Sequence, residues 1–283
     1  GLWLIAWGLY KKIVVADNVA GIVNRVFAPY DTLSAVGTPE DGIRCLLAVY
    51  AFAVQIYCDF SGYTDVARGT ARLLGFRIML NFNLPYIALN PSDFWSRWHI
   101  SLSSWLRDYL YIPLGGNRHG KWATHRNLMI TMLLGGLWHG AAWNFVYWGA
   151  FHGLLLIAYE LCNQKHVKSE LSLKNVVRGV VMFHFVCVGW LLFRAQNMET
   201  VYVFFDAIFH HFNSSPEAVE ILKDLIFFSW FLVVFQAAQA LLGRLNVMRG
   251  APWFLRLNVW VFLVVSILGL APKQAQEFIY FAF

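Results

Sequence analysis

Charged side chains are scarce in this sequence. Only 13% of its 283 residues are Asp, Glu, Lys or Arg, about half the share that is usual in soluble domains. Hydrophobic residues make up 59%, and they include 13 Trp, 12 Tyr and 24 Phe. A water-soluble chain of this length could not bury that much apolar surface. The composition therefore excludes an ordinary soluble enzyme and predicts an integral membrane protein.

The motifs of several functional classes are also missing. There is no GxSxG elbow, no P-loop and no dinucleotide fingerprint. No HxxxH or CxxC spacing offers a metal site, and we interpret the four cysteines as reduced packing residues. The net charge of +6 is spread through the connections between apolar runs, which is typical of membrane topology signals. Nucleic-acid binding and a bound metal are therefore not expected.

The beginning of the chain has neither a signal peptide nor a starting Met. It opens at Gly1 within an apolar stretch. We expect a C-terminal portion of a longer chain, with further membrane helices before it. Residues 1–283 are expected to form a single membrane-embedded domain with no soluble domain.

Long runs without any charged residue mark the predicted membrane segments. They cover 45–58, 127–159, 179–193, 225–243 and 257–272. About 20 residues are needed to cross a bilayer, and the charged ends of the shorter runs can reach the interface. The sequence thus predicts an all-α polytopic bundle in the cell inner membrane, with the basic connections in the cytoplasm. The orientation of residues 1–30 stays open, and 78–92 is a predicted loop because of its Asn and Pro residues.

The run 127–159 is too long to cross the membrane once. Its 33 residues would make a helix of about 50 Å, against about 30 Å of hydrocarbon. We expect a re-entrant hairpin that bends at 135–140, where three glycines weaken the helix. This bend places His139 deep in the membrane, where a neutral imidazole could accept a proton. The alternative is a packed His that donates to a carbonyl group.

A second candidate, His99, lies in a predicted short interfacial helix. Asn90 is its expected N-cap, and Pro91 its first residue. From there Trp95, His99, Ser103 and Arg107 follow at four-residue spacing, so one helix would present all of them on one face. The alternative is a polar stripe that faces water or lipid headgroups.

Three further polar residues receive structural interpretations. His152 is predicted to be a packing residue. Asp65 is expected to pair with Arg68 or Arg72 on the same helix. Asp59 is expected at the end of that helix, with its carboxylate reaching the membrane surface.

Two long strings of the sequence resemble the membrane-bound O-acyltransferases. They are FWSRWHISLSSWLRDYLYIPLGGNR (94–118) and GGLWHGAAWNFVYWGAFHG (135–153). GLYKKIVVADNVA (8–20), YCDFSGYTDVARG (57–69) and FIYFAF (278–283) are similar to the family as well. Within the family, the chain resembles the branch that acetylates bacterial exopolysaccharides such as alginate, more than the branch that moves D-alanine onto teichoic acids.

The resemblance implies a fold with re-entrant and interfacial helices around a central funnel, which meets a buried His. That His, in the WHG motif, matches His139, and a second functional His, in the RWHISLS motif, matches His99. His99 would orient the acceptor or His139, or help to hold the donor. We predict substrate contacts at Trp138, Asn144, Ser103 and Arg107.

The implied reaction moves an acyl group from a cytoplasmic thioester to an extracytoplasmic polysaccharide hydroxyl. Acetyl-CoA or another acyl thioester would be the donor, with no bound cofactor. Transfer would be direct or through an acyl-accepting partner protein. The alternative classes are a polysaccharide or precursor transporter or export channel without acyl-transfer chemistry, and a non-catalytic membrane scaffold. A transporter often shows paired halves with interrupted helices, which this sequence does not display.

Overall fold

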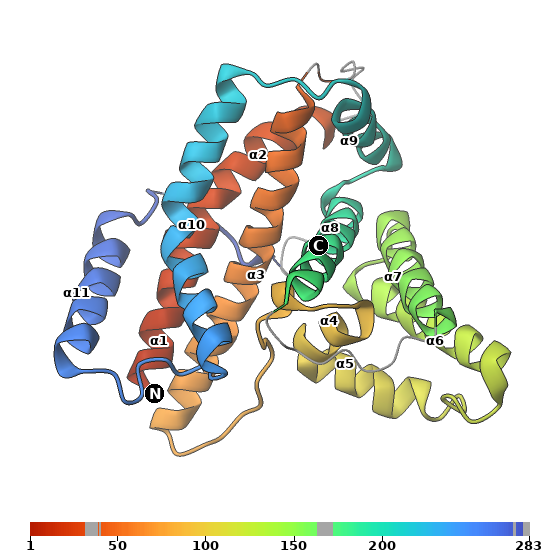
Figure 1. Ribbon diagram of the computed structural model, residues 1–283, viewed down its shortest axis with the longest axis horizontal. Helices are drawn as coiled ribbons and strands as arrows, with labels where there is room; N and C mark the ends of the chain where they lie inside the picture. The colour runs from red at the N-terminus through yellow and green to blue at the C-terminus, as the bar shows by residue number, and fades with distance from the viewer. Residues whose placement is uncertain (32–38, 40, 163–171, 274–275, 280–283) are drawn as a thin grey trace. The chain divides into compact units, whose positions relative to one another are not determined.

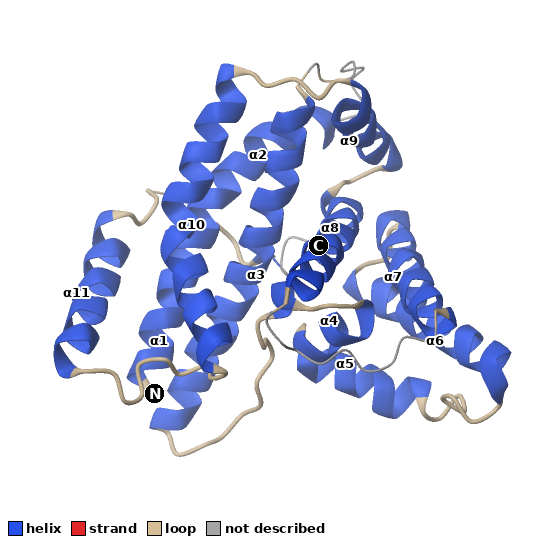
Figure 2. Cartoon of the chain, in the orientation of Figure 1, coloured by secondary structure: helices blue, strands red, loops and turns tan. Residues whose placement is uncertain are grey.

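The computed structural model describes residues 1–31, 39, 41–162, 172–273 and 276–279. Throughout these ranges, helices are joined by loops and no strand occurs (Figure 2). The predicted all-α fold is confirmed. The chain divides into two compact units. Unit 1 consists of Gly1–Met79 with Tyr202–Ala282, and unit 2 consists of Leu80–Val201.

Unit 1 begins with a nearly continuous helical segment. Its parts are α1 (Leu2–Leu9), the π-helical η1 (Tyr10–Ala16) and α2 (Asp17–Asp31). The long helix α3 (Gly42–Leu73) runs beside them (Figure 1). Glycine makes this approach possible, because a Cβ atom at Gly62 would lie 2.8 Å from the carbonyl oxygen of Gly8. The first 30 residues, which the sequence left open, are thus part of a packed helical layer.

The rest of unit 1 comes from the C-terminal part of the chain. It contains α9 (Met198–His210), whose first residues belong to unit 2, α10 (Pro216–Leu242) and α11 (Trp253–Gly269). The side chain of Ser215 accepts a hydrogen bond from Ala218 N at the start of α10, and Gly243 ends it with a φ of 61°. Phe204 of α9 packs on Phe27 of α2, with ring centroids 4.4 Å apart. This ring contact joins α9 to the N-terminal helical segment within unit 1.

The predicted position of Asp59 is wrong. Because α3 extends to Leu73, Asp59 lies well inside the helix, and it is only 2% exposed. Its Oδ1 lies 2.7 Å from Nζ of Lys12, and its Oδ2 accepts a hydrogen bond of 2.6 Å from the backbone N–H of Ile279. A carboxylate buried this deeply needs such partners. The predicted pair of Asp65 with Arg68 is confirmed at 2.9 Å.

Within the described ranges, three helices are long and apolar enough to cross a membrane. They are α3, α8 (Leu173–Arg194) and α10, and the uncharged runs 45–58, 179–193 and 225–243 correspond to them. The run 257–272 corresponds largely to the shorter apolar helix α11. Much of α10 is uncovered by protein, with Phe227 55% and Val233 60% exposed. Apolar side chains exposed along a spanning helix are expected where lipid is the solvent.

Unit 2 contains the remaining helices, together with α8. In chain order they are η2 (Pro85–Ile87), α4 (Pro91–Arg97), α5 (Ile100–Leu106), the π-helical η3 (Arg107–Tyr111), α6 (Gly120–His139), α7 (Trp143–Leu161) and α8. The predicted hairpin over 127–159 is confirmed, because α6 and α7 pack side by side (Figure 1). The helix continues through Gly135 and Gly136 and ends at His139, with Gly140 in extended backbone. The hairpin therefore turns immediately after His139.

Candidate active site

The segment that carries His99 is two helices rather than one. The predicted start is confirmed, since Asn90 Oδ1 accepts a hydrogen bond of 2.8 Å from Asp93 N and Pro91 is the first residue of α4. The predicted continuation is wrong, because α4 ends at Arg97 and α5 begins only at Ile100. The carbonyl of Arg97 instead accepts a hydrogen bond of 3.0 Å from Asn83 N. A partner outside the helix has thus replaced the local helical pattern.

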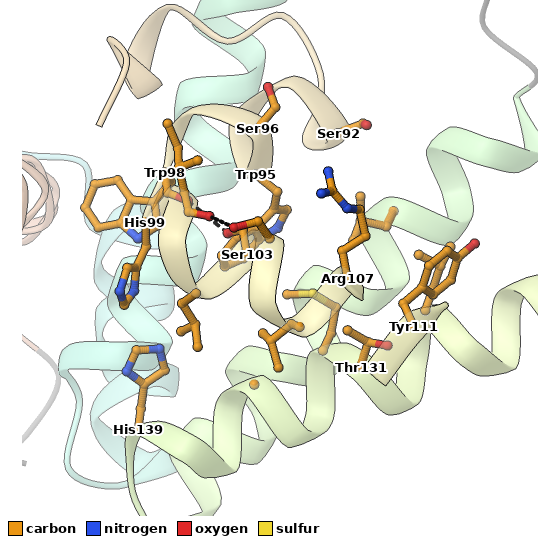
Figure 3. Close-up of a pocket in the computed structure, with 18 of the residues that line it drawn as sticks. Ser92, Trp95, Ser96, Trp98, His99, Ser103, Arg107, Tyr111, Thr131 and His139 are labelled. Carbon is orange, nitrogen blue, oxygen red and sulfur yellow. Dashed lines mark hydrogen bonds between the residues drawn. The ribbon is translucent and has the colours of Figure 1, made fainter. Parts of the chain in front are cut away.

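A cavity of about 480 Å³ nevertheless collects the residues that this pattern singled out. Its lining includes Trp95, His99, Ser103, Arg107 and His139. Figure 3 shows the rings of His99 and His139 directed toward one another, with Arg107 and Tyr111 at some distance along the cavity. The cavity belongs entirely to unit 2. It offers two imidazoles at one end and a cation at the other.

Aromatic rings surround His139. The centroid of its ring lies 5.0 Å from that of Trp138, 5.2 Å from Trp148, 5.2 Å from Phe193 and 6.3 Å from Phe145. These rings come from α6, α7 and α8, so three helices define the position of the imidazole. His139 itself is half-buried, so its imidazole lies against aromatic rings and remains open on one side to an incoming substrate.

His99 is more deeply buried than His139. Its residue is 7% exposed, and its ring centroid lies 6.0 Å from that of Trp138. Burial lowers the pKa of His99 to about 4, because desolvation disfavours the imidazolium form. His99 is therefore neutral near pH 7 and can accept one hydrogen bond and donate another.

The four predicted substrate contacts occupy different surroundings. Ser103 lines the cavity, and its hydroxyl donates a hydrogen bond of 3.0 Å to Trp98 O (Figure 3). Arg107 also lines the cavity, and it is exposed and paired with Asp108 at 2.7 Å. Trp138 is 57% exposed beside His99, and Asn144 is half-buried in the first turn of α7. Neither Trp138 nor Asn144 is part of the lining.

The sequence patterns did not identify several residues that line the cavity. Thr131 and Gly135 precede His139 at four-residue spacing on α6 and line the same cavity, a pattern that the sequence contains. Trp148 is another, and it lies between His139 and the packed His152, whose ring centroid is 4.9 Å from that of Trp148. No local signal could have identified Phe193, because only the packing of α8 brings it to His139.

A glycine turn follows η3, the helix that forms the distant end of the cavity. Gly115 and Gly116 have φ values of 106° and 56°, a region that favours glycine. The side-chain amide of Asn127, which is fully buried, donates hydrogen bonds of 3.1 Å to Leu114 O and 3.0 Å to Gly116 O. These bonds attach the turn after η3 to α6. They thereby fix η3, which carries Arg107 and Tyr111.

Comparison with known proteins extends these observations. The family model described as "MBOAT, membrane-bound O-acyltransferase family" matches residues 1–202. The chain is 46% identical over 204 residues to "Probable alginate O-acetylase AlgI" of Azotobacter vinelandii, covering 71% of this chain and 38% of that protein. It is 40% identical over 200 residues to the peptidoglycan O-acetyltransferase of Helicobacter pylori, covering 71% and 37%. It is 33% identical over 162 residues to the teichoic acid D-alanyltransferase of Bacillus subtilis, covering 53% and 41%. The matched regions thus span about two fifths of the length of these curated relatives.

Proposed function

The chain belongs to the membrane-bound O-acyltransferase family, in the branch of the alginate O-acetylases, and from this premise we propose that it transfers an acyl group, acetyl in the first instance, to a polysaccharide hydroxyl outside the cytoplasm. The donor is a cytoplasmic thioester such as acetyl-CoA. Transfer is direct, or passes through a hydroxyl of an acyl-accepting partner protein. Family membership and the apolar helices α3, α8 and α10 make the chain a multi-pass protein of the inner membrane.

The observation that carries the proposal is the pair of imidazoles in one cavity. His139 takes the proton from the acceptor hydroxyl as its oxygen attacks the thioester carbonyl. The tetrahedral intermediate then collapses, the carbon–sulfur bond breaks, and the departing sulfur receives the proton from His139. The products are an ester and a free thiol, and the imidazole is neutral again. General base catalysis of this kind typically contributes about 10²- to 10⁴-fold in rate.

His99 has a supporting part in this scheme. Because it is neutral and faces His139 (Figure 3), it can orient the acceptor hydroxyl or His139 by a hydrogen bond. Ser103 and Arg107 are proposed to contact the donor along the cavity, where a guanidinium group suits a phosphate-bearing thioester. Trp138 and Asn144 are proposed to contact substrate outside the cavity lining.

The test uses the full-length protein in cells. His139→Ala should lower acetylation of the cell-surface polysaccharide at least 10²-fold, measured by mass analysis of the polymer with membrane expression confirmed. His210→Ala is the matched control, because this exposed side chain lies on α9 and pairs with Asp206 of the same helix at 2.9 Å. Normal acetylation in the His139→Ala strain would remove the proposed chemistry. If the His139→Ala and His210→Ala strains both export polysaccharide without acetyl groups, the result would instead favour a transporter.

A further inference from the structure

His99 has an unusual backbone conformation. Its φ and ψ are 43° and 54°, the left-handed region that a residue with a Cβ atom seldom occupies. Such strain persists only where surrounding contacts impose it, and it is often found at functional sites. Because His99 directly precedes α5, its backbone sets the direction in which the imidazole leaves the chain. The contacts that impose this conformation therefore determine where the ring lies.

The start of α5 lacks an ordinary cap. A helix leaves its first N–H groups without internal partners, and the residue before the helix commonly accepts from one of them with its own side chain. His99 holds that position and makes no such bond. Its ring faces the cavity instead (Figure 3). The N–H groups of α5 must find acceptors elsewhere.

Asn81, in the preceding loop, supplies acceptors for the first two N–H groups of α5. Its backbone oxygen accepts a hydrogen bond of 3.0 Å from Ile100 N, and its side-chain Oδ1 accepts one of 3.0 Å from Ser101 N. On the other side of His99, Asn83 N donates to Arg97 O at 3.0 Å, and Arg97 Nη1 donates to Asn83 O at 3.2 Å. The loop residues 81–83 thus bind the chain immediately before and after His99.

We infer that Asn81 is a positioning residue for His99, and that its side-chain amide caps α5 in place of the His99 side chain so that the imidazole can face His139. This inference rests on the proposed function for its catalytic consequence. Its conformational part stands on the two hydrogen bonds alone. Only the hydrogen bond that Oδ1 accepts depends on the Asn81 side chain. A substitution therefore removes that bond and leaves the one that the Asn81 backbone oxygen accepts.

Three variants of the full-length protein separate this role from general packing. Asn81→Ala removes the acceptor and should lower the turnover number about 10- to 100-fold with a smaller change in KM. Asn81→Asp keeps an acceptor oxygen, which is also favoured at a helix N-terminus, and should stay within about threefold of the parent. Asn83→Ala is the matched control, because Asn83 holds Arg97 through its backbone atoms.

A double variant tests whether the effect acts through His99. In a His99→Ala background, Asn81→Ala should cause no further loss of turnover, since effects of residues that act as a unit are not additive. An equal loss with and without His99 would show a merely structural role and overturn the inference. Unchanged turnover of Asn81→Ala in the parent background would overturn it as well.

A measurement independent of turnover keeps this result apart from the proposed function. The modification rate of His99 by diethyl pyrocarbonate, followed by peptide mass spectrometry, should rise severalfold in Asn81→Ala and stay at the parent value in Asn81→Asp and Asn83→Ala. An unchanged rate in Asn81→Ala would refute the positioning role. If the modification rate rises in Asn81→Ala while His139→Ala retains acetylation, Asn81 does position His99, and the proposed chemistry is the part that fails.

Discussion

Alanine in place of Gly136 should separate α6 and α7, two of the three helices around His139. A Cβ atom at this position would lie 3.2 Å from the carbonyl carbon of Phe145 on α7, and under 3.0 Å from its oxygen. Ordinary contacts of a Cβ atom begin at about 3.4 Å, and here the obstacle is backbone rather than a flexible side chain. The helices must therefore move apart by on the order of 1 Å.

The size of the effect follows from this displacement. Overpacking in a well-packed contact costs roughly 1–3 kcal/mol. Gly136 is three residues before His139, so a shift of about 1 Å is passed to the imidazole, and a misplacement of that size can cost about 10²-fold in rate. We expect Gly136→Ala to lower the melting temperature of the purified full-length protein and to reduce polysaccharide acetylation in cells about 10²-fold.

Two further variants make this prediction decisive. Gly149→Ala alters the opposite side of the same contact, where a Cβ atom would lie 3.1 Å from Leu133 Cα, and it should behave like Gly136→Ala. Among the described residues, a Cβ atom at Gly179 on α8 would meet only Leu89 Cδ2, at 3.7 Å, and alanine favours a helix over glycine by about 1 kcal/mol. The control Gly179→Ala should match or exceed the parent in melting temperature. If Gly136→Ala melted and acetylated like Gly179→Ala, the close approach of α6 and α7 would not be what holds His139.

Two more predictions concern charge. Lys12 Nζ lies 2.8 Å from Asp17 and 2.7 Å from Asp59. Lys12→Met should destabilise unit 1 by roughly 3 kcal/mol, because it leaves two buried carboxylates without this cation. Thermal melting should show the loss, and the control Lys174→Met, at an exposed position, should show none. The pKa of His99 is lowered from 6.5 to about 4 in the folded protein, so between these values the unfolded chain binds more protons and stability falls as the pH falls. The stabilisation that comes from neutral His99 is full above pH 6.5 and is lost by about pH 4, a change of about 3 kcal/mol. His99→Gln should therefore reduce the acid dependence of the melting temperature. An equally steep dependence in that variant would contradict the lowered pKa of His99.

The sequence by itself determined the membrane character, the helical class and the hairpin. Scarcity of charge and five uncharged runs leave few alternatives, since only lipid can accommodate so much apolar surface. The length of 127–159 required a bend, and the glycines located it within a few residues of His139. The resemblance of two strings to a known family then selected His139 and His99. The membrane character, the helical class and the hairpin depend on composition, length and local pattern, which a single sequence contains, whereas the choice of the two histidines depends on the resemblance.

Tertiary structure alone decided how the candidate site is assembled. Four-residue spacing predicted one helix through His99, but the loop residues 81–83 offered the backbone other hydrogen-bond partners and broke it. Asp59 looked like a residue at a helix end until Lys12 and the Ile279 backbone supplied partners inside unit 1. Phe193 reaches His139 only because α8 packs beside α7. In each case a group distant in sequence supplies the deciding contact, and local patterns carry no information about such partners.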